Sequence, residues 1–324
     1  MKNKIAILGS GAMGTACANV LAENNNDVII YGIDNNELND LNKGFNKKYF
    51  ENKLEKNFKT TTNLEEAIDH ANFIIIAIPT KFIPDVFNKL IELIKYKTVI
   101  INVSKGFWPE TNYFVHNKME SLSFENNNIK GVVSLIGPSF AVDIINKQIT
   151  IVNAVSRELK IAKKVKQLFS NSWFGVSIND DVIGAEIGST YKNILAIASG
   201  MAVGLGYSTN TQAALLTMGL KEMAKYANFL GARIETIYDL CGLGDLMLTG
   251  LSEKSRNYQY GINFFKNKLD DNKTTVEGLY ALKYIYEQNI SKNKLNLPLI
   301  EGIYKIVYNK ENPNKIINNL MKKI

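Results

Sequence analysis

The sequence contains few of the residues that build metal centres or disulfide frameworks. Its 324 residues include two histidines, His70 and His116, and two cysteines, Cys17 and Cys241. None of the four has the spacing of a zinc ligand set, so we expect no metal. Both histidines stand in polar, helix-like segments, where we expect them at the surface rather than in a catalytic role. The two distant cysteines are expected to be reduced thiols in the core or near a site, which favours a cytoplasmic protein.

The chain also lacks the segments that mark secretion, membrane insertion or nucleic-acid binding. Its N-terminus enters a strand-like run directly, without the apolar stretch of a signal peptide. Polar residues at 207–212 interrupt the uncharged run 194–220, so we expect two buried helices and no stable membrane insertion. The formal charge is +7, but carboxylates accompany the lysines along most of the chain and no basic arm is present. This balance suits an anionic small molecule better than a nucleic acid.

The N-terminal residues carry a dinucleotide-binding fingerprint. An apolar strand-like run, Lys4–Leu8, leads straight into Gly-Ser-Gly-Ala-Met-Gly at positions 9–14, and helix-favouring residues follow. In this arrangement Gly9 permits the tight turn, Gly11 lets the backbone approach a pyrophosphate, and Gly14 permits close packing of helix on strand. A glycine-rich turn alone is weak evidence, but the flanking strand and helix favour binding of NAD(H) or NADP(H).

Apolar runs continue through the first half of the chain. The run at 28–33 ends beside Asp34, where a carboxylate can accept hydrogen bonds from the adenosine ribose of a dinucleotide. Further strand-like runs cover 72–79, 98–103, 131–136 and, more weakly, 149–155, with helix-like stretches at 81–94 and 110–122. Continuous apolar strands between helices predict a mostly parallel sheet that is covered on both faces.

The predicted strands do not extend into the second half of the chain. From about Asp181 onward, helical patterns dominate without a low-complexity linker or an internal repeat. We therefore predict an α/β fold in which residues 1–180 form a Rossmann-type, doubly wound dinucleotide-binding domain. Residues 181–324 are predicted to form an all-helical substrate and catalytic domain.

Small and polar residues follow two of the predicted strands. Ser104-Lys105-Gly106 comes after one, and Gly137-Pro138-Ser139-Phe140-Ala141 after another. Ligands bind sheets of this kind beyond the carboxyl ends of the strands. A lysine at the mouth of that crevice is well placed to hold an anion, whereas Gly137-Pro138 alone is typical of a simple turn.

The helical half contains residues that can supply reductive chemistry. Lys192-Asn193 lies in an apolar helix-like run, Asp245 and Thr249 have the i,i+4 spacing of one helix face, and Ser255-Arg256-Asn257 follow. Alone, Lys192 is typical of a lysine that reaches solvent from a buried helix, and Asp245 of a helix cap. Arg256 alone is compatible with a solvated surface charge. Together, an ammonium, a carboxylate, a hydroxyl and a phosphate-sized basic cluster suit the reduction of a phosphorylated ketone.

Taken together, these motifs resemble those of bacterial NAD(P)-dependent glycerol-3-phosphate dehydrogenases. The resemblance covers nearly the whole chain, in order, through residues 9–14, 104–106, 137–141, 191–194, 242–246, 254–257 and 276–278. It implies that a bound NAD(H) or NADP(H) exchanges hydride between dihydroxyacetone phosphate and glycerol 3-phosphate. It also implies that the product supplies phospholipid synthesis.

The same resemblance implies a role for each matching residue. Lys192 corresponds to the general acid that protonates the carbonyl oxygen of dihydroxyacetone phosphate. Residues that orient the substrate and this lysine correspond to Lys105, Asn193, Asp245 and Thr249. Substrate binding is implied for Lys105, Gly137, Ser139, Lys192, Asp245 and the phosphate cluster Ser255, Arg256 and Asn257. Cofactor binding is implied for Gly9, Ser10, Gly11, Ala12, Met13, Gly14, Asp34, Lys105, Ala141, Arg256 and Glu277.

One departure from the family pattern bears on the choice of cofactor. Bacterial members usually carry a basic residue where this chain has Ile33, and the neighbouring Asp34 repels a 2′-phosphate. Lys43, Lys47 or Lys48 could supply the missing cation instead. We expect NADH to be used at least as well as NADPH.

Two other functions fit part of the pattern. One is another two-domain reductase acting on a hydroxy acid or a sugar phosphate; the lack of a plausible catalytic histidine argues against the hydroxy acid. The other is a non-catalytic NAD(H)-sensing protein, which would need no proton donor such as Lys192. The partner we expect is a small-molecule substrate, and the sequence leaves a homodimer open.

Overall fold

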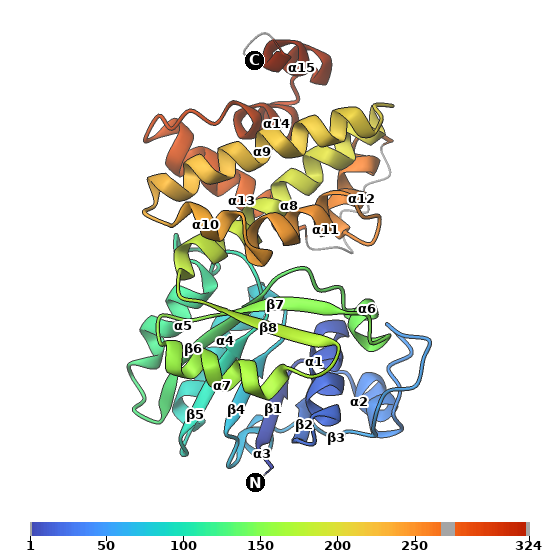
Figure 1. The fold of residues 1–324 in the computed structure, drawn as a ribbon, viewed down its shortest axis with the longest axis vertical. Helices are drawn as coiled ribbons and strands as arrows, with labels where there is room; N and C mark the ends of the chain where they lie inside the picture. The colour runs from blue at the N-terminus through green and yellow to red at the C-terminus, as the bar shows by residue number, and fades with distance from the viewer. Residues whose placement is uncertain (1, 267–275, 322–324) are drawn as a thin grey trace. The chain divides into compact units, whose positions relative to one another are not determined.

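The computed structural model describes residues 2–266 and 276–321, and the chain divides into two compact units (Figure 1). Unit 1 is Met1–Val182 and unit 2 is Ile183–Ile324. Strands and helices alternate through unit 1, whereas every element assigned to the described part of unit 2 is helical. The predicted α/β class, with a helical C-terminal half, is therefore confirmed.

Unit 1 is built on an eight-stranded sheet with the order β3-β2-β1-β4-β5-β6-β7-β8. The strands are β1 (Lys4–Leu8), β2 (Asp27–Tyr31), β3 (Lys59–Thr61), β4 (Phe73–Ile76), β5 (Thr98–Asn102), β6 (Ile129–Ile136), β7 (Thr150–Val155) and β8 (Phe174–Asn179). Neighbouring strands pair in parallel except β6 and β7. The order of the first six strands is that of a Rossmann fold, as predicted.

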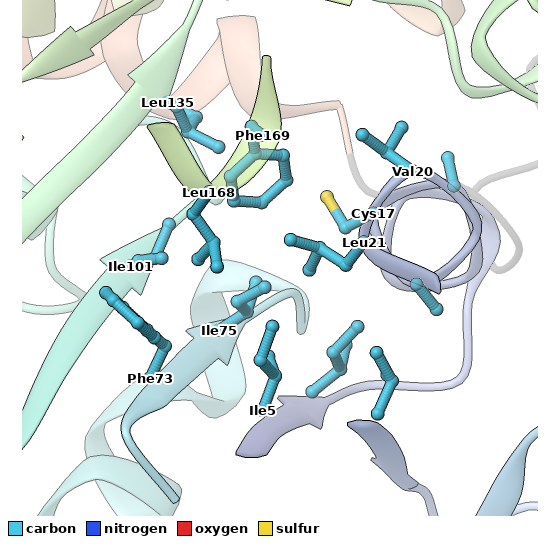
Figure 2. Close-up of a cluster of buried hydrophobic side chains, with 14 of the residues drawn as sticks. Ile5, Cys17, Val20, Leu21, Phe73, Ile75, Ile101, Leu135, Leu168 and Phe169 are labelled. Carbon is cyan, nitrogen blue, oxygen red and sulfur yellow. The ribbon is translucent and has the colours of Figure 1, made fainter. Parts of the chain in front are cut away.

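Helices cover both faces of this sheet. They are α1 (Ala12–Glu23), α2 (Asn35–Asn42), α3 (Leu64–Ile68), α4 (Ile83–Leu93), α5 (Val115–Ser123), α6 (Ala141–Ile145) and α7 (Leu159–Phe169). Successive strand residues point to opposite faces, so β1 contributes to two cores. Ile5 joins a cluster with Cys17 and Leu21 of α1 (Figure 2), while Ala6 joins a second cluster with Phe87 of α4.

Several features of the sheet were not predicted. Strand β3 is only three residues long, and β8 alternates buried and partly buried residues instead of forming a continuous apolar run. Strand β7 runs antiparallel to β6 because the 13 residues between them contain only the short helix α6. A parallel return requires a longer crossover, usually with a full helix.

Unit 2 is a set of helices around the long helix α8 (Val182–Gly204). The others in the described residues are α9 (Thr209–Phe229), α10 (Ile234–Ile237), the π-helical turn η2 (Leu240–Gly244), α11 (Asp245–Gly250), α12 (Arg256–Asn263), η3 (Phe264–Lys266), α13 (Glu277–Ile285), η4 (Tyr286–Ser291), α14 (Pro298–Asn309) and α15 (Pro313–Met321). Helices α8 and α9 account for the uncharged run of the sequence, as predicted, but the expectation that both are buried is wrong for α9, in which only Gln212 and Gly219 are buried between Thr209 and Leu220. Among the described residues, no helix has the length and apolarity needed to cross a membrane.

The expectation that both histidines lie at the surface is wrong for one of them. His70 is exposed in the turn after α3, but His116 of α5 has no exposed surface. Burial, with a smaller contribution from the charge of Arg157, lowers the pKa of His116 to about 3. His116 is therefore neutral at physiological pH. Cys17 and Cys241 are buried thiols, as expected.

Seven lysines of unit 1 gather at one edge of its sheet, although the sequence shows no basic arm. Two hollows of about 1160 and 520 Å³ lie where β1, β4, β5 and β6 begin. Their linings include one carboxylate, Asp27, and the lysines Lys2, Lys4, Lys56, Lys59, Lys97, Lys130 and Lys164. The fold thus concentrates charges that are dispersed in the sequence, and we call this the lysine edge.

In unit 2, the buried carboxylate of Glu222 joins α9 to the N-terminus of α14. Its oxygens accept hydrogen bonds from the backbone N–H groups of Leu299 (2.6 Å) and Ile300 (3.1 Å). Burial raises the pKa of Glu222 to about 7, more than these two donors lower it. The folded protein therefore holds a proton between about pH 4.5 and 7 that the unfolded chain releases.

We expect the contribution of Glu222 to stability to be complete below pH 4.5 and to be lost as the pH rises through 7. Because Glu222→Gln is neutral at every pH, the melting temperature of the wild type should fall relative to that of the variant between pH 5 and pH 8. Thermal melts of both proteins at the two pH values test this. A relative rise would show that the helix N–H groups outweigh burial.

Candidate active site

The glycine turn after β1 adopts the conformation that a dinucleotide fingerprint requires. Gly9 has φ +124°, and a Cβ there would lie 2.3 Å from the carbonyl oxygen of Ala77. A Cβ on Gly14 would lie 2.0 Å from the carbonyl oxygen of Gly9, so helix α1 packs directly on the turn. At Gly11, by contrast, a Cβ would meet only the Tyr49 hydroxyl, at 4.0 Å. Gly11 therefore faces space that a ligand can enter.

Helix α1 begins at Ala12, immediately after this turn, and Gly11 provides no side-chain cap. The first N–H groups of a helix, here including Ala12, Met13 and Gly14, have no acceptor within the helix. Such groups, together with the helix dipole, bind phosphate. The residues present thus fit the pyrophosphate of a dinucleotide.

A buried asparagine supports the turn from behind. The side chain of Asn46 donates to the carbonyl oxygen of Ser10 and to Thr15 Oγ1, both at 2.9 Å. It lies in the irregular segment between α2 and β3, far from the fingerprint in sequence. No local motif indicates this role, so the sequence interpretation missed it.

A group of charges surrounds the end of β2, where an adenosine ribose is expected. Ile33 is 85% exposed, and the carboxylate of Asp34 caps α2 through the N–H groups of Asn36 (2.9 Å) and Glu37 (3.4 Å). The cap leaves the Asp34 side chain 41% exposed. Asp34 thus lies just after β2 and has a structural role as a helix cap, while its predicted contact with a ribose stays a prediction.

Glu37, which the sequence interpretation missed, is the buried centre of this group. Its carboxylate accepts from Ser10 Oγ (2.5 Å), Lys48 Nζ (2.5 Å) and the Tyr49 hydroxyl (3.1 Å). The hydrogen bond from Lys48 to Glu37 raises the pKa of Lys48, so this lysine stays protonated. Lys48 also lies 3.7 Å from Asp34. The single ammonium of Lys48 therefore pairs with the carboxylates of both Glu37 and Asp34, which leaves an excess of negative charge in this group.

The residues after β5 and β6 come together at one small cavity. Lys105, Ser139 and Met13 all line this cavity of about 20 Å³. Ser139 Oγ donates to the carbonyl oxygen of Gly137 at 3.0 Å. Gly137 itself, at φ +157°, passes so close to β7 that a Cβ would lie 2.9 Å from Val152 Cα. Close packing against β7 therefore explains the glycine at position 137. Lys105 and Ser139 share their cavity with Met13 at the start of α1.

In unit 2, Lys192, Asp245 and Thr249 form a buried cluster. Lys192 Nζ lies 2.5 Å from Asp245 Oδ1 and 2.9 Å from Thr249 Oγ1, which in turn is 3.4 Å from the same carboxylate oxygen. The three residues are 5%, 1% and 5% exposed. The Lys192 side chain does not reach solvent, so the alternative of a snorkelling lysine is wrong. A buried ammonium requires such a partner.

Close backbone contact explains how α8 and α11 bring this pair together. One turn before Lys192, a Cβ on Gly188 would lie 2.5 Å from the carbonyl oxygen of Cys241 in η2. Helix α11 starts at Asp245, directly after η2, so Asp245 and Thr249 lie on one face of it, as their spacing predicts. Asn193, also buried, follows Lys192, and its backbone lies against Gly278 at the start of α13.

The predicted phosphate cluster forms the start of helix α12. Ser255 is its N-cap and accepts from the N–H of Tyr258 at 3.3 Å. Asn257 Oδ1 accepts from the N–H of Gly278 at 3.1 Å, which ties α12 to the start of α13. Arg256 extends into solvent, 63% exposed, with Nη2 3.9 Å from Glu277 Oε1. That exposed, distant pair is weak and leaves the guanidinium able to bind an anion.

These features place the chain in the class of two-domain dehydrogenases with a Rossmann-type N-terminal half. The family model described as NAD-dependent glycerol-3-phosphate dehydrogenase N-terminus matches residues 4–162, and the corresponding C-terminus model matches residues 181–318. The chain therefore belongs to the NAD-dependent glycerol-3-phosphate dehydrogenase family.

Individual relatives agree with this placement over nearly their full length. A protein of Mycoplasma mobile named glycerol-3-phosphate dehydrogenase [NAD(P)+] is 43% identical, covering 99% of this chain and 98% of the relative. A protein of Malacoplasma penetrans with the same name is 38% identical, covering 97% and 95%. The crystal structure of glycerol-3-phosphate dehydrogenase from Coxiella burnetii aligns with TM-score 0.87 at 28% identity, covering 99% of both chains.

Proposed function

We propose that this protein reversibly reduces dihydroxyacetone phosphate to glycerol 3-phosphate with NADH or NADPH. The buried cluster of Lys192, Asp245 and Thr249 carries the proposal, because it holds an ammonium ready to give a proton to a carbonyl oxygen. The family and the named relatives support the same reaction. In this assignment residues 1–180 bind the dinucleotide and residues 181–324 carry the substrate and catalytic residues.

The bound dinucleotide supplies the hydride, and residues of this chain do the rest. Lys192 donates a proton from Nζ to the developing alkoxide and takes it back in the reverse direction. Asp245 and Thr249 orient the ammonium through their contacts with Nζ. Lys105, Asn193, Gly137 and Ser139 orient the substrate. Arg256 and the first turn of α12, with Ser255 and Asn257, bind its phosphate.

Cofactor contacts are proposed for the glycine turn and a few further residues. The start of α1 holds the pyrophosphate, and Asp34 accepts from the ribose. The full proposed set is Gly9, Ser10, Gly11, Ala12, Met13, Gly14, Asp34, Lys105, Ala141, Arg256 and Glu277.

The direct test is to follow the loss of NADH absorbance with dihydroxyacetone phosphate and, separately, with unphosphorylated dihydroxyacetone, 2-oxo acids and other sugar phosphates. We expect turnover with dihydroxyacetone phosphate and at least 10-fold less with dihydroxyacetone, since one charged hydrogen bond is worth about 1.5–3 kcal/mol. NADH binding without turnover would indicate a sensor. A preference for another substrate would indicate a different reductase.

We further propose that the reaction takes place in the cytoplasm and supplies glycerol 3-phosphate for phospholipid synthesis. We propose no nucleic-acid partner, because the phenylalanines that line the lysine edge, Phe58 and Phe73, are buried and offer no platform for stacking bases. Light scattering on the purified protein distinguishes a monomer from a homodimer.

We expect NADH to give a kcat/KM at least equal to that of NADPH. Ile33 offers no charge, and Lys48 is already shared between Glu37 and Asp34, so a 2′-phosphate would meet uncompensated carboxylates. Steady-state kinetics with both cofactors at one salt concentration test this. Ile33→Arg should raise kcat/KM with NADPH; a clear NADPH preference of the wild type would refute the charge argument.

A further inference from the structure

A buried polar network connects the neutral His116 to the segment that carries Lys105. His116 Nδ1 lies 2.8 Å from Ser134 Oγ, and Asn102 Nδ2 lies 3.3 Å from the same hydroxyl. The three residues come from α5, β6 and the end of β5, and none of them has exposed surface. Polar side chains so deeply buried are costly unless they are paired.

From Asn102 the network reaches the backbone next to Lys105. Asn102 Oδ1 accepts from the N–H of Ser104 at 3.0 Å, while Asn102 Nδ2 donates to the Ser104 carbonyl oxygen at 2.9 Å. The Asn102 side chain thus holds both backbone groups of Ser104. Its amide orientation is in turn held by the Ser134 hydroxyl, which His116 fixes from the other side.

Two more hydrogen bonds attach residues 104–105 to the residues that follow β4. Ser104 Oγ donates to the carbonyl oxygen of Ile78 at 2.7 Å, and Thr80 Oγ1 donates to the carbonyl oxygen of Lys105 at 2.9 Å. Gly106 follows at φ +105°. The backbone of Lys105 is therefore held on both sides, which directs its side chain toward the cavity shared with Ser139 and Met13.

We propose that Ser134 and His116 are positioning residues that act on the reaction through Asn102 by fixing the backbone from which Lys105 projects. Neither residue touches the cavity lined by Lys105. A neutral histidine suits this task, because its bond to Ser134 does not change across the physiological pH range. The proposal rests on the proposed role of Lys105 in binding substrate.

The first test compares Ser134→Ala with Ser123→Ala, which removes another buried hydroxyl of unit 1. Ser123 Oγ donates to the carbonyl oxygen of Met119 at 2.7 Å and has no bond to the Lys105 segment. We expect Ser134→Ala to lower kcat/KM for dihydroxyacetone phosphate roughly 10- to 100-fold, mainly through KM, as for other misplaced binding groups. Ser123→Ala should keep its activity. Equal activity losses would overturn the proposal.

The variants His116→Leu and His116→Asn separate positioning from packing. Asparagine can keep a polar atom near the position of Nδ1, so His116→Asn should recover most of the kcat/KM that His116→Leu loses. Recovery of melting temperature without recovery of kcat/KM would contradict a positioning role.

A double-mutant cycle with Lys105→Ala decides whether the effect passes through Lys105. If it does, adding Ser134→Ala to Lys105→Ala should cost less than about twofold in kcat/KM, because the two changes act on one group. Additive losses would overturn the proposal.

Hydrogen exchange gives a readout that does not depend on turnover. The amide of Ser104 should exchange at least tenfold faster in Ser134→Ala than in the wild type or Ser123→Ala. An unchanged rate would overturn the proposed network even if the wild type proves inactive with dihydroxyacetone phosphate. Inactivity of the wild type would refute only the proposed function.

Discussion

Replacing Lys192 with alanine should lower kcat by roughly 10²- to 10⁴-fold while NADH binding is retained, as expected when a general acid is removed. Lys192 Nζ is the buried cation of unit 2 that contacts both Asp245 and Thr249. Lys192 is itself only 5% exposed, so water can replace this proton donor only poorly. Single-turnover and steady-state kinetics with dihydroxyacetone phosphate measure the loss.

This variant also leaves Asp245 buried without its ammonium, which by itself costs stability, typically about 3–5 kcal/mol. Lys192→Ala combined with Asp245→Asn removes both charges and provides a folded protein in which the missing donor can still be assessed. Lys225→Ala, at an exposed lysine of α9 that bonds the Asn296 carbonyl oxygen, is the matched control and should retain full activity. Near-native turnover of a folded Lys192→Ala protein would refute the assignment.

Replacing Arg256 with alanine should weaken recognition of the substrate phosphate by about 1.5–3 kcal/mol, equivalent to roughly 10- to 150-fold in kcat/KM. The guanidinium stands at the start of α12, and among the described residues its ion-pair partner is the distant Glu277. Its removal takes away a charged hydrogen-bond donor but leaves the helix cap of Ser255 in place. Arg256→Lys should recover part of the loss, since it keeps the charge but not the two-pronged geometry.

Comparing phosphorylated with unphosphorylated substrate isolates the effect of Arg256. Because the proposed cofactor contact of Arg256 is common to both reactions, we expect a clearly larger loss with dihydroxyacetone phosphate than with dihydroxyacetone. Arg233→Ala, the same substitution at the N-cap of α10, is the control. Equal losses with both substrates would mean that Arg256 serves the fold or the cofactor instead.

The regular part of the fold follows from patterns that are local in sequence. The strand Lys4–Leu8 has the predicted bounds because its residues from Ile5 to Leu8 are apolar on both faces, and the glycine turn directly follows it. The reversal of β7 was not predictable from apolar runs, because a run carries no direction. The direction of β7 depends on the length of the connection from β6 through α6. This length can be interpreted only when the position of β6 in the sheet is known.

The same distinction between local and long-range contacts decides which parts of the site could be predicted from the sequence. The pair Asp245 and Thr249 lies on one face because four residues make about one helical turn. The contact of Asp245 with Lys192 spans more than fifty residues and requires the close approach of η2 to Gly188. For a related reason, Glu37 was missed and His116 was misjudged. Burial of a polar residue depends on partners such as Lys48 and Ser134, which come from distant segments.

The lysine edge has a practical consequence for handling the protein. A cation-exchange surface or a negatively charged electrode will adsorb unit 1 preferentially through the lysine edge, where the strands of its sheet begin. The opposite side of the same sheet, with the glycine turn and Lys105, then faces the solution. Adsorption should therefore orient unit 1 with its glycine turn accessible, without any engineered tag.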